Sequence, residues 1–329
     1  MEIIESSGTT GLIFEIVDIV LAILSFCLNV LVAHILVKRL GLTQCDTVVS
    51  FIICIIDLLY SIFSGSCLII VWATHYQLLQ TSNYFCQFNG FFYTLIISSV
   101  ADIIMILAVL RYLAICCNRI YSIKCWVIIS SLFIIFNAAC SIVSVINSAY
   151  RIYPSIKYCT FNGEKTIGLT IWYILGIKEF IALIIIVFCY LRIARHYSKY
   201  LNDIRKDSNK LISQFHPKES LDPNKNGTNS QLILDYGEAE TKVKSSIKKL
   251  YIIISIYAIE FLGFLGIQTI FKFIGTLPNP VWDNIFSVLS HTIPLTSPLF
   301  ILFFHDETNH ELQSMLYIMS YRLAKKIKI

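Results

Sequence analysis

Charged side chains stand inside long apolar stretches of this sequence, where they could pair with one another, hold a charged ligand or carry protons. Lys178 and Glu179 are neighbours within IWYILGIKEFIALIII, and Asp102 and Glu260 lie in two further apolar stretches. In a bilayer such charges are costly, so they face the protein interior and pair there. Two roles are open for Lys178: it projects into a pocket and binds an acidic ligand, or it joins an ionic network with Asp102 or Glu260.

Asn29 and Asp57 form a second polar set, each in the middle of an apolar stretch. We expect Asp57 to face the interior of a helix bundle, with Asn29 as its partner. Two roles are again open for the pair. It is either a packing hydrogen bond between two helices, or part of a switch or an ion site.

Residue sets that perform catalysis are missing from the sequence. The 7 histidines are scattered, and no Ser/His/Asp or Cys/His set has catalytic spacing. There is no phosphate-binding glycine loop and no cluster with metal-ligand spacing. We therefore expect neither an enzyme nor a metal site.

Long apolar runs must position these residues. The 329-residue chain is 56% hydrophobic and 14% charged, which is typical of membrane proteins. Backbone groups in hydrocarbon must be satisfied internally, and the runs lack the period of two of a barrel strand, so we expect an all-α bundle of seven transmembrane helices. The runs lie near 11–37, 47–72, 85–115, 125–147, 168–195, 247–272 and 282–304.

Basic residues predict the orientation of the bundle. With the N-terminus outside, 21 of the 26 Lys and Arg fall on the cytoplasmic side, as the positive-inside rule requires. We expect a multi-pass plasma-membrane protein with a cytoplasmic C-terminus and no cleaved signal peptide. The net charge of +5 then reflects topology, and we expect no nucleic-acid partner.

Two of the 11 cysteines fall on the oxidising side in this topology. Cys86 begins the third apolar run, and Cys159 lies in the loop that follows the fourth. A disulfide between them would clamp this loop over the bundle, and we predict that pair. The other cysteines lie mostly in apolar runs, where cysteine packs as a small hydrophobe.

An ordered set of residues resembles the rhodopsin-like (class A) G-protein-coupled receptors over about residues 15–325. The members are Asn29, Asp57, Cys86, Arg111 within Leu110-Arg111-Tyr112, Trp126, Cys159, Tyr190 and Pro298 within SPLFI. The resemblance implies a receptor that transmits an extracellular stimulus to a heterotrimeric G protein. It further implies that Arg111, Tyr112, Tyr190 and Pro298 take part in coupling or switching.

Departures from the family pattern mark a divergent member. Leu110 replaces the acid before Arg111, so the local pair that usually restrains this arginine is absent. The sixth run has no proline, and Gly263 and Gly266 are expected to supply flexibility there instead. Ile301 replaces a tyrosine, so no hydroxyl is available at that position.

The resemblance also implies a ligand pocket between the third, fifth, sixth and seventh spans, with Tyr93, Lys178 and His291 as candidates. Tyr93 stands where amine receptors carry an aspartate, which disfavours a biogenic amine. His291 stands where opsins carry the retinal lysine, and imidazole cannot form that Schiff base. We therefore disfavour retinal and expect no cofactor; the ligand is an unknown small molecule or peptide.

We predict an extracellular N-terminus at 1–10 and a transmembrane domain at 11–304. Two further segments are polar or amphipathic: a loop within this domain and the C-terminal region. The loop 196–246 is polar, and we expect a disordered middle with basic helical ends that dock a G protein or merely anchor the chain. Residues 305–329 carry apolar residues at helical spacing followed by lysines. This pattern predicts a short amphipathic helix lying on membrane lipids, followed by a cytoplasmic tail.

Three functions remain open at this stage. A G-protein-coupled receptor is favoured by the ordered motif set. A membrane transporter or channel would use the intramembrane charges as its path. An opsin-like relative without retinal or G-protein coupling is favoured by the altered motifs.

Overall fold

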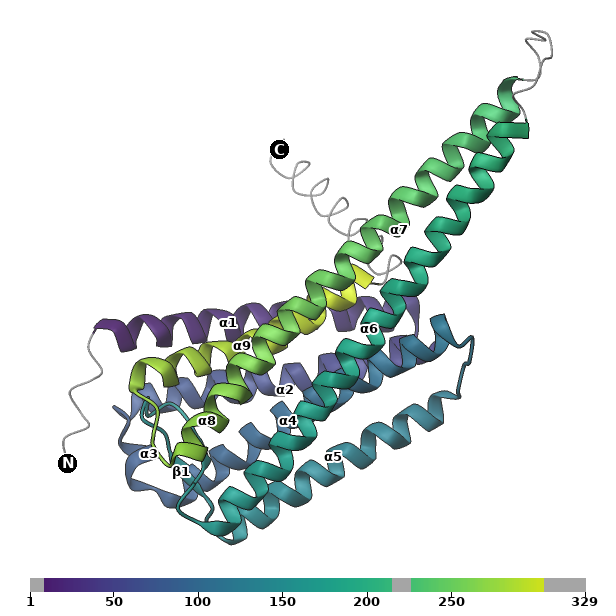
Figure 1. Ribbon diagram of the computed structural model, residues 1–329. Helices are drawn as coiled ribbons and strands as arrows, with labels where there is room; N and C mark the ends of the chain where they lie inside the picture. The colour runs from purple at the N-terminus through teal and green to yellow at the C-terminus, as the bar shows by residue number, and fades with distance from the viewer. Residues whose placement is uncertain (1–8, 215–225, 305–329) are drawn as a thin grey trace, which may run out of the picture.

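The computed structural model describes residues 9–214 and 226–304, which form a bundle of long helices (Figure 1). The α-helices are α1 (Thr9–Ile35), α2 (Cys45–Ala73), α3 (Gln77–Thr81), α4 (Asn83–Cys116), α5 (Ile123–Ile146), α6 (Thr166–Gln214), α7 (Asn226–Phe261), α8 (Ile267–Ile274) and α9 (Pro280–Phe304). Two π-helical turns, η2 (Leu36–Leu40) and η3 (Leu262–Gly266), interrupt the series.

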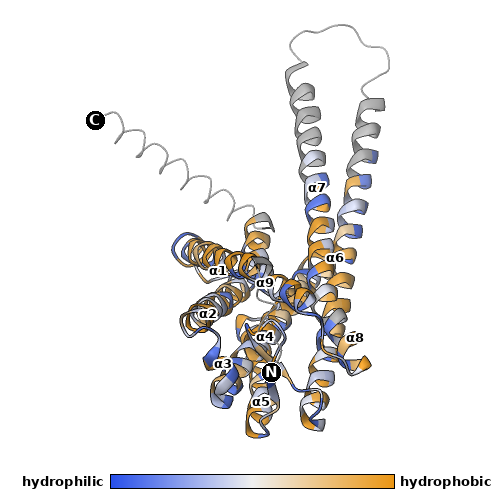
Figure 2. Ribbon diagram, turned by 90° about the vertical axis from the view of Figure 1, so that its left-hand side faces the viewer, coloured by the Kyte–Doolittle hydropathy of each residue, from blue (hydrophilic) through white to orange (hydrophobic). Residues whose placement is uncertain are grey.

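Six of the described helices are long and apolar enough to cross a membrane. The seventh crossing is made by α7, η3 and α8 together, which pack beside α6 and α9. Hydrophobic residues predominate along the membrane-crossing helices, as Figure 2 shows, and many large ones are exposed on the outside of the bundle. The protein is therefore a multi-pass membrane protein with seven membrane-crossing segments, and the predicted fold class is confirmed.

The central helix is α4. In its most apolar 18-residue window 83% of the residues are buried, against 22% for the same window of α5. Small residues such as Ser98, Ser99 and Ala101 on α4 let the backbones of its neighbours α2, α5 and α6 approach closely. Ile103 and Ile104 are then fully buried in the largest apolar cluster.

One end of the bundle, here called the hairpin end, carries the only two strands among the described residues. β1 (Tyr150–Ile152) and β2 (Cys159–Phe161) pair antiparallel, with Ile152 opposite Cys159. The hairpin, residues 150–161, lies between the ends of α5 and α6 and beside α8 (Figure 1). Its tip, residues 153–158, enters the bundle.

At the opposite end, here called the extension end, α6 and α7 run side by side well beyond the other helices (Figure 1). The basic ends at 192–199 and 242–249 are helical, as expected. The helices reach further than expected, to Gln214 and from Asn226, so most of the predicted loop 196–246 is helical. The predicted amphipathic helix at 305–329 lies outside the described residues.

The π-helical turn η3 falls at the two glycines expected to replace the missing proline of the sixth run. A Cβ atom on Gly263 would lie 2.9 Å from Leu289 Cδ1 of α9. The absence of a side chain at Gly263 thus lets this turn pack directly against α9. Such π-turns are frequent at functional sites in helices.

Candidate functional site

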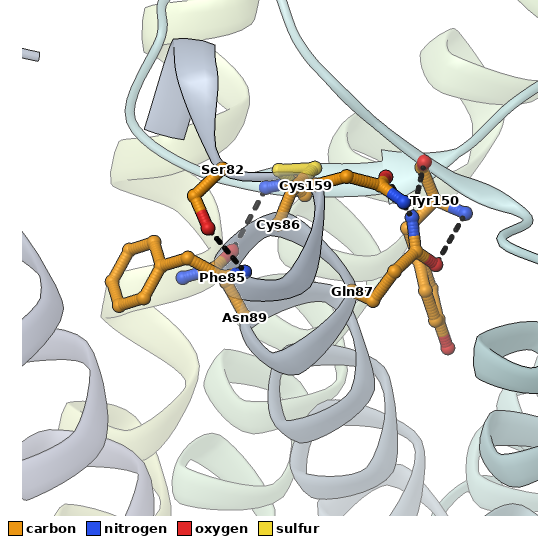
Figure 3. The surroundings of a disulfide bond; sticks show 8 residues. Ser82, Phe85, Cys86, Gln87, Asn89, Tyr150 and Cys159 are labelled. Atoms are coloured by element: carbon orange, nitrogen blue, oxygen red, sulfur yellow. Dashed lines mark hydrogen bonds between the residues drawn. A yellow bond between two sulfur atoms is a disulfide. The ribbon is translucent and has the colours of Figure 1, made fainter. Parts of the chain in front are cut away.

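A disulfide between Cys86 and Cys159 fastens the hairpin to the first turn of α4 (Figure 3). Two amides on the same turn reinforce it. Gln87 donates to the carbonyl of Tyr150 at 2.9 Å and accepts from its N–H at 3.2 Å. Asn89 Oδ1 accepts from the Cys159 N–H at 2.8 Å. Both strands are therefore fixed to α4.

The tip of the hairpin is bound to α9 through Asp283. The Tyr158 hydroxyl and the Ser155 N–H both donate to this carboxylate, the latter at 2.7 Å. The Tyr158 ring stacks on Tyr93 of α4 with 5.0 Å between the ring centroids. Burial and the neighbouring Asp283 raise the pKa of Tyr158, so its hydroxyl remains a donor.

Lys157 carries a buried ammonium from the hairpin tip into the bundle. Its Nζ lies 3.0 Å from Asp18 Oδ2 of α1, and Ser287 of α9 donates to the same oxygen at 2.9 Å. His291 is close by, with Nδ1 3.7 Å from Asp18 Oδ1 and Nε2 bonded to Ser64 of α2. The tip thereby links α1, α2 and α9 and closes the hairpin end of the bundle.

Beneath the hairpin, Tyr93 lines a cavity of about 30 Å³. A second cavity of about 280 Å³ lies between α6 and the η3–α8 region. Trp172, Gly176 and Glu179 of α6 border both cavities. Of the three expected pocket residues, Tyr93 therefore lies in a cavity wall, whereas His291 packs below the hairpin tip.

Lys178 does not face the pocket that was considered for it. Its Nζ lies 2.6 Å from Asp102 Oδ2 of α4 and 2.9 Å from Asn137 Oδ1 of α5. Asn137 also donates to Asp102 at 2.7 Å. Of the two roles considered for Lys178, the structure therefore shows the ionic network with Asp102 and not the pocket side chain. Because successive helical residues point about 100° apart, Glu179 faces the cavities instead.

Arg111 is held near the C-terminal end of α4 by an acid that sequence reasoning missed. Its Nε and Nη2 bond to the two oxygens of Asp46, at 3.0 and 3.3 Å. Tyr190 of α6 also interacts with the guanidinium. Asp46 lies in the first turn of α2, so the expected lack of an acid at Leu110 is compensated from another helix.

Tyr112, the next residue, is half-buried, and its ring packs edge-on against Phe188 of α6 at 6.0 Å between centroids. It points away from the partly buried Arg111–Asp46 pair, because adjacent helical residues diverge. Of the four predicted switch residues, the structure thus brings together Arg111 and Tyr190.

The hydrogen bond that Pro298 removes from α9 is replaced by a residue of α1. Proline lacks an N–H, so Pro298 leaves the carbonyl of Pro294 without its usual helical donor. Asn29 Nδ2 fills that position at 2.8 Å. Asp57 is fully buried, as expected, but its two carboxylate oxygens make no hydrogen bond among the described residues. The expected Asn29–Asp57 pair is therefore not formed, because the Asn29 amide donates to the Pro294 carbonyl of α9 instead.

Comparisons with known proteins place the fold. No family model and no curated protein sequence matches this chain. Among solved structures, the crystal structure of squid rhodopsin superposes with a TM-score of 0.70. That match covers 93% of this chain and 85% of the rhodopsin at 13% sequence identity. At this identity the match establishes a rhodopsin-like seven-helix fold and nothing about the stimulus.

Proposed function

We propose that this chain is a G-protein-coupled receptor of the plasma membrane, with the hairpin end outside the cell. The rhodopsin-like fold supports the class of protein, and the positive-inside distribution supports the orientation. In this topology α6 and α7 extend into the cytoplasm, where their basic faces meet a heterotrimeric G protein.

The observation that carries the proposal is the Arg111–Asp46 pair with Tyr190 beside it. In the resting bundle the arginine is bound between α2 and α6. A stimulus that separates these helices would release the guanidinium toward the partner. A hydrogen bond to a charged group contributes about 1.5–3 kcal/mol, so its loss shifts a two-state population by about 10- to 150-fold.

Nucleotide exchange on G proteins, measured in membranes without added ligand, tests this. Asp46→Asn should raise basal exchange about tenfold or more, because the neutral amide binds the guanidinium less strongly. Arg111→Ala should abolish exchange. Glu164→Gln, an exposed acid at the hairpin end, is the matched control and should behave as wild type. Equal exchange in all four proteins at equal surface level would contradict the proposal.

A transporter or channel, the alternative, has weaker support. Its path would need mid-membrane charges that face a common passage. Instead Lys178 and Asp102 pair between α4, α5 and α6, while Glu260 of α7 accepts from Thr296 of α9 at 3.2 Å. The charges thus lie in two separate helix contacts. Solute or ion flux that requires Lys178 would revive this reading.

A further inference from the structure

We propose that the cavity between α6 and the η3–α8 region binds an elongated amphiphile with a protonated amine, which enters from the bilayer and pairs with Glu179. The cavity is hereafter called the side cavity. As the identity of the receptor's stimulus, this inference rests on the function proposed above. The binding site itself stands on four observations about the described residues.

The first observation is a buried carboxyl that forms no ion pair. Glu179 is 3% exposed, and Oε1 accepts from Ser98 Oγ at 2.5 Å. No hydrogen bond to Oε2 and no ion pair to Glu179 occurs among the described residues. The adjacent Lys178 is bound to Asp102. A buried carboxylate without a cation is strongly unfavourable, so this position favours a cationic partner from outside the chain.

The second observation concerns the other cation near this wall. Lys272 of α8 lies over the ring of Trp172, 4.1 Å from its centroid. Its Nζ donates to the carbonyl of Phe161 in the hairpin at 2.8 Å. Lys272 is therefore engaged with the hairpin and does not border the side cavity. The only charged residue in the described cavity wall is Glu179, which selects against an anionic headgroup.

The third observation is the shape and chemistry of the space. Apart from Glu179 the wall is mostly apolar, with Leu183 on α6 and Phe261 on α7. Ligand pockets usually measure about 300–1,000 Å³, and the side cavity has about 280 Å³. It is large enough for the head and first part of a chain. Ile177, Phe180 and Leu262 at its border are exposed, so the rest of the chain extends into hydrocarbon.

The fourth observation is the closed hairpin end. A water-borne ligand would have to displace Tyr158 from Asp283 and Lys157 from Asp18, both of which are buried. Entry between α6 and η3 breaks none of these bonds. The molecule therefore reaches Glu179 sideways, which requires that it partition into the bilayer first.

The test uses the full chain in lipid nanodiscs and a radiolabelled long-chain primary amine. Saturable binding is expected, with at least tenfold weaker binding of the fatty acid and the alcohol of equal length. Glu179→Gln should weaken amine binding about 10- to 100-fold. Glu164→Gln, an exposed acid just after the hairpin, is the matched control and should bind as wild type.

A second variant keeps the test independent of any folding defect. Gly176 lines the side cavity, and a Cβ there meets no atom within 4 Å, so the side chain of Gly176→Leu starts in open space and occupies part of the cavity. Leucine is the better helix former, so the thermal midpoint should hold or rise while amine binding disappears. Unchanged binding in Gly176→Leu or Glu179→Gln overturns the inference, as does fatty acid or alcohol binding as tight as the amine.

Failure of this inference is distinguishable from failure of the proposed function. Amine binding is read directly and needs no G protein. If no amine binds but basal nucleotide exchange still depends on Arg111, the amine ligand is overturned and the receptor function is not. Saturable, Glu179-dependent binding without any nucleotide exchange upholds the site and contradicts the receptor proposal.

Discussion

Removal of the Lys157 ammonium from the hairpin should destabilise the protein far more than removal of an exposed charge that lies just after the hairpin. Lys157 and Asp18 are 2% and 0% exposed at 3.0 Å. Lys157→Met leaves Asp18 as a buried carboxylate with Ser287 as its remaining hydrogen-bond donor. Breaking such a pair costs about 3–5 kcal/mol. At about 2–4 °C per kcal/mol, the thermal midpoint should fall by roughly 6–20 °C.

The double variant Lys157→Met/Asp18→Asn provides the decisive comparison. Replacing both charges removes the orphan, and a neutral pair in a buried site is often no less stable than the ion pair. The double variant should therefore be more stable than Lys157→Met, although it carries one more substitution. The measurement is thermal unfolding of the purified protein in one detergent for both singles, the double and wild type.

An exposed ion pair at the edge of the hairpin is the control for the effect of burial. Arg151 and Glu164 are closer, at 2.7 Å, but their side chains are 26% and 80% exposed. An exposed pair contributes about 0–1 kcal/mol, so Glu164→Gln should shift the midpoint by about 4 °C or less. Additive effects in the Lys157/Asp18 cycle, or equal shifts for Lys157→Met and Glu164→Gln, would refute the reasoning from burial.

Three further predictions concern the anchors of the bundle. Asn29→Leu should lower stability by about 1–3 kcal/mol, and by less in a Pro298→Ala background, because alanine restores a donor to the Pro294 carbonyl; thermal midpoints of the four proteins measure this. Reductant should lower the midpoint of wild type but not of Cys86→Ser, because the disulfide closes a loop between residues 73 apart. Gly90→Ala should cost about 1–3 kcal/mol, because its Cβ would overlap the Tyr150 side chain, whereas Gly163→Ala, with open space around it, should not.

Features written in local sequence were predictable. The length and apolarity of the runs predicted seven crossings, because hydrocarbon imposes a minimum helix length. The topology left Cys86 and Cys159 on one side, and the structure joins them. Gly263 and Gly266 marked the irregular turn η3. The crossings and the turn depend on residue type and spacing within one segment, and the disulfide follows from the topology that the crossings impose.

Salt bridges and hydrogen bonds between distant segments were not predictable from residue types. Asp46 stands 65 positions from Arg111 and reads as an ordinary acid in the first turn of a helix. Lys157 lies in a polar loop, where a solvated side chain is the usual outcome, yet it reaches Asp18 across 139 positions. Adjacent charges such as Lys178 and Glu179 diverge by about 100°, and only the neighbours Asp102 and Ser98 decide which faces where.

The π-helical turn η3 changes how positions beyond it are counted. Glu260 and Gln268 are both buried, although residues eight apart lie about 80° from each other on an uninterrupted α-helix. The wider turn absorbs about one residue and realigns them. A single deletion within 262–266 would remove this extra residue and leave a regular α-helix, in which Lys272 still faces Phe161 and Trp172. A single deletion elsewhere in α7 has no extra residue to remove, and it would rotate the terminal segment by about 100° relative to the rest of α7.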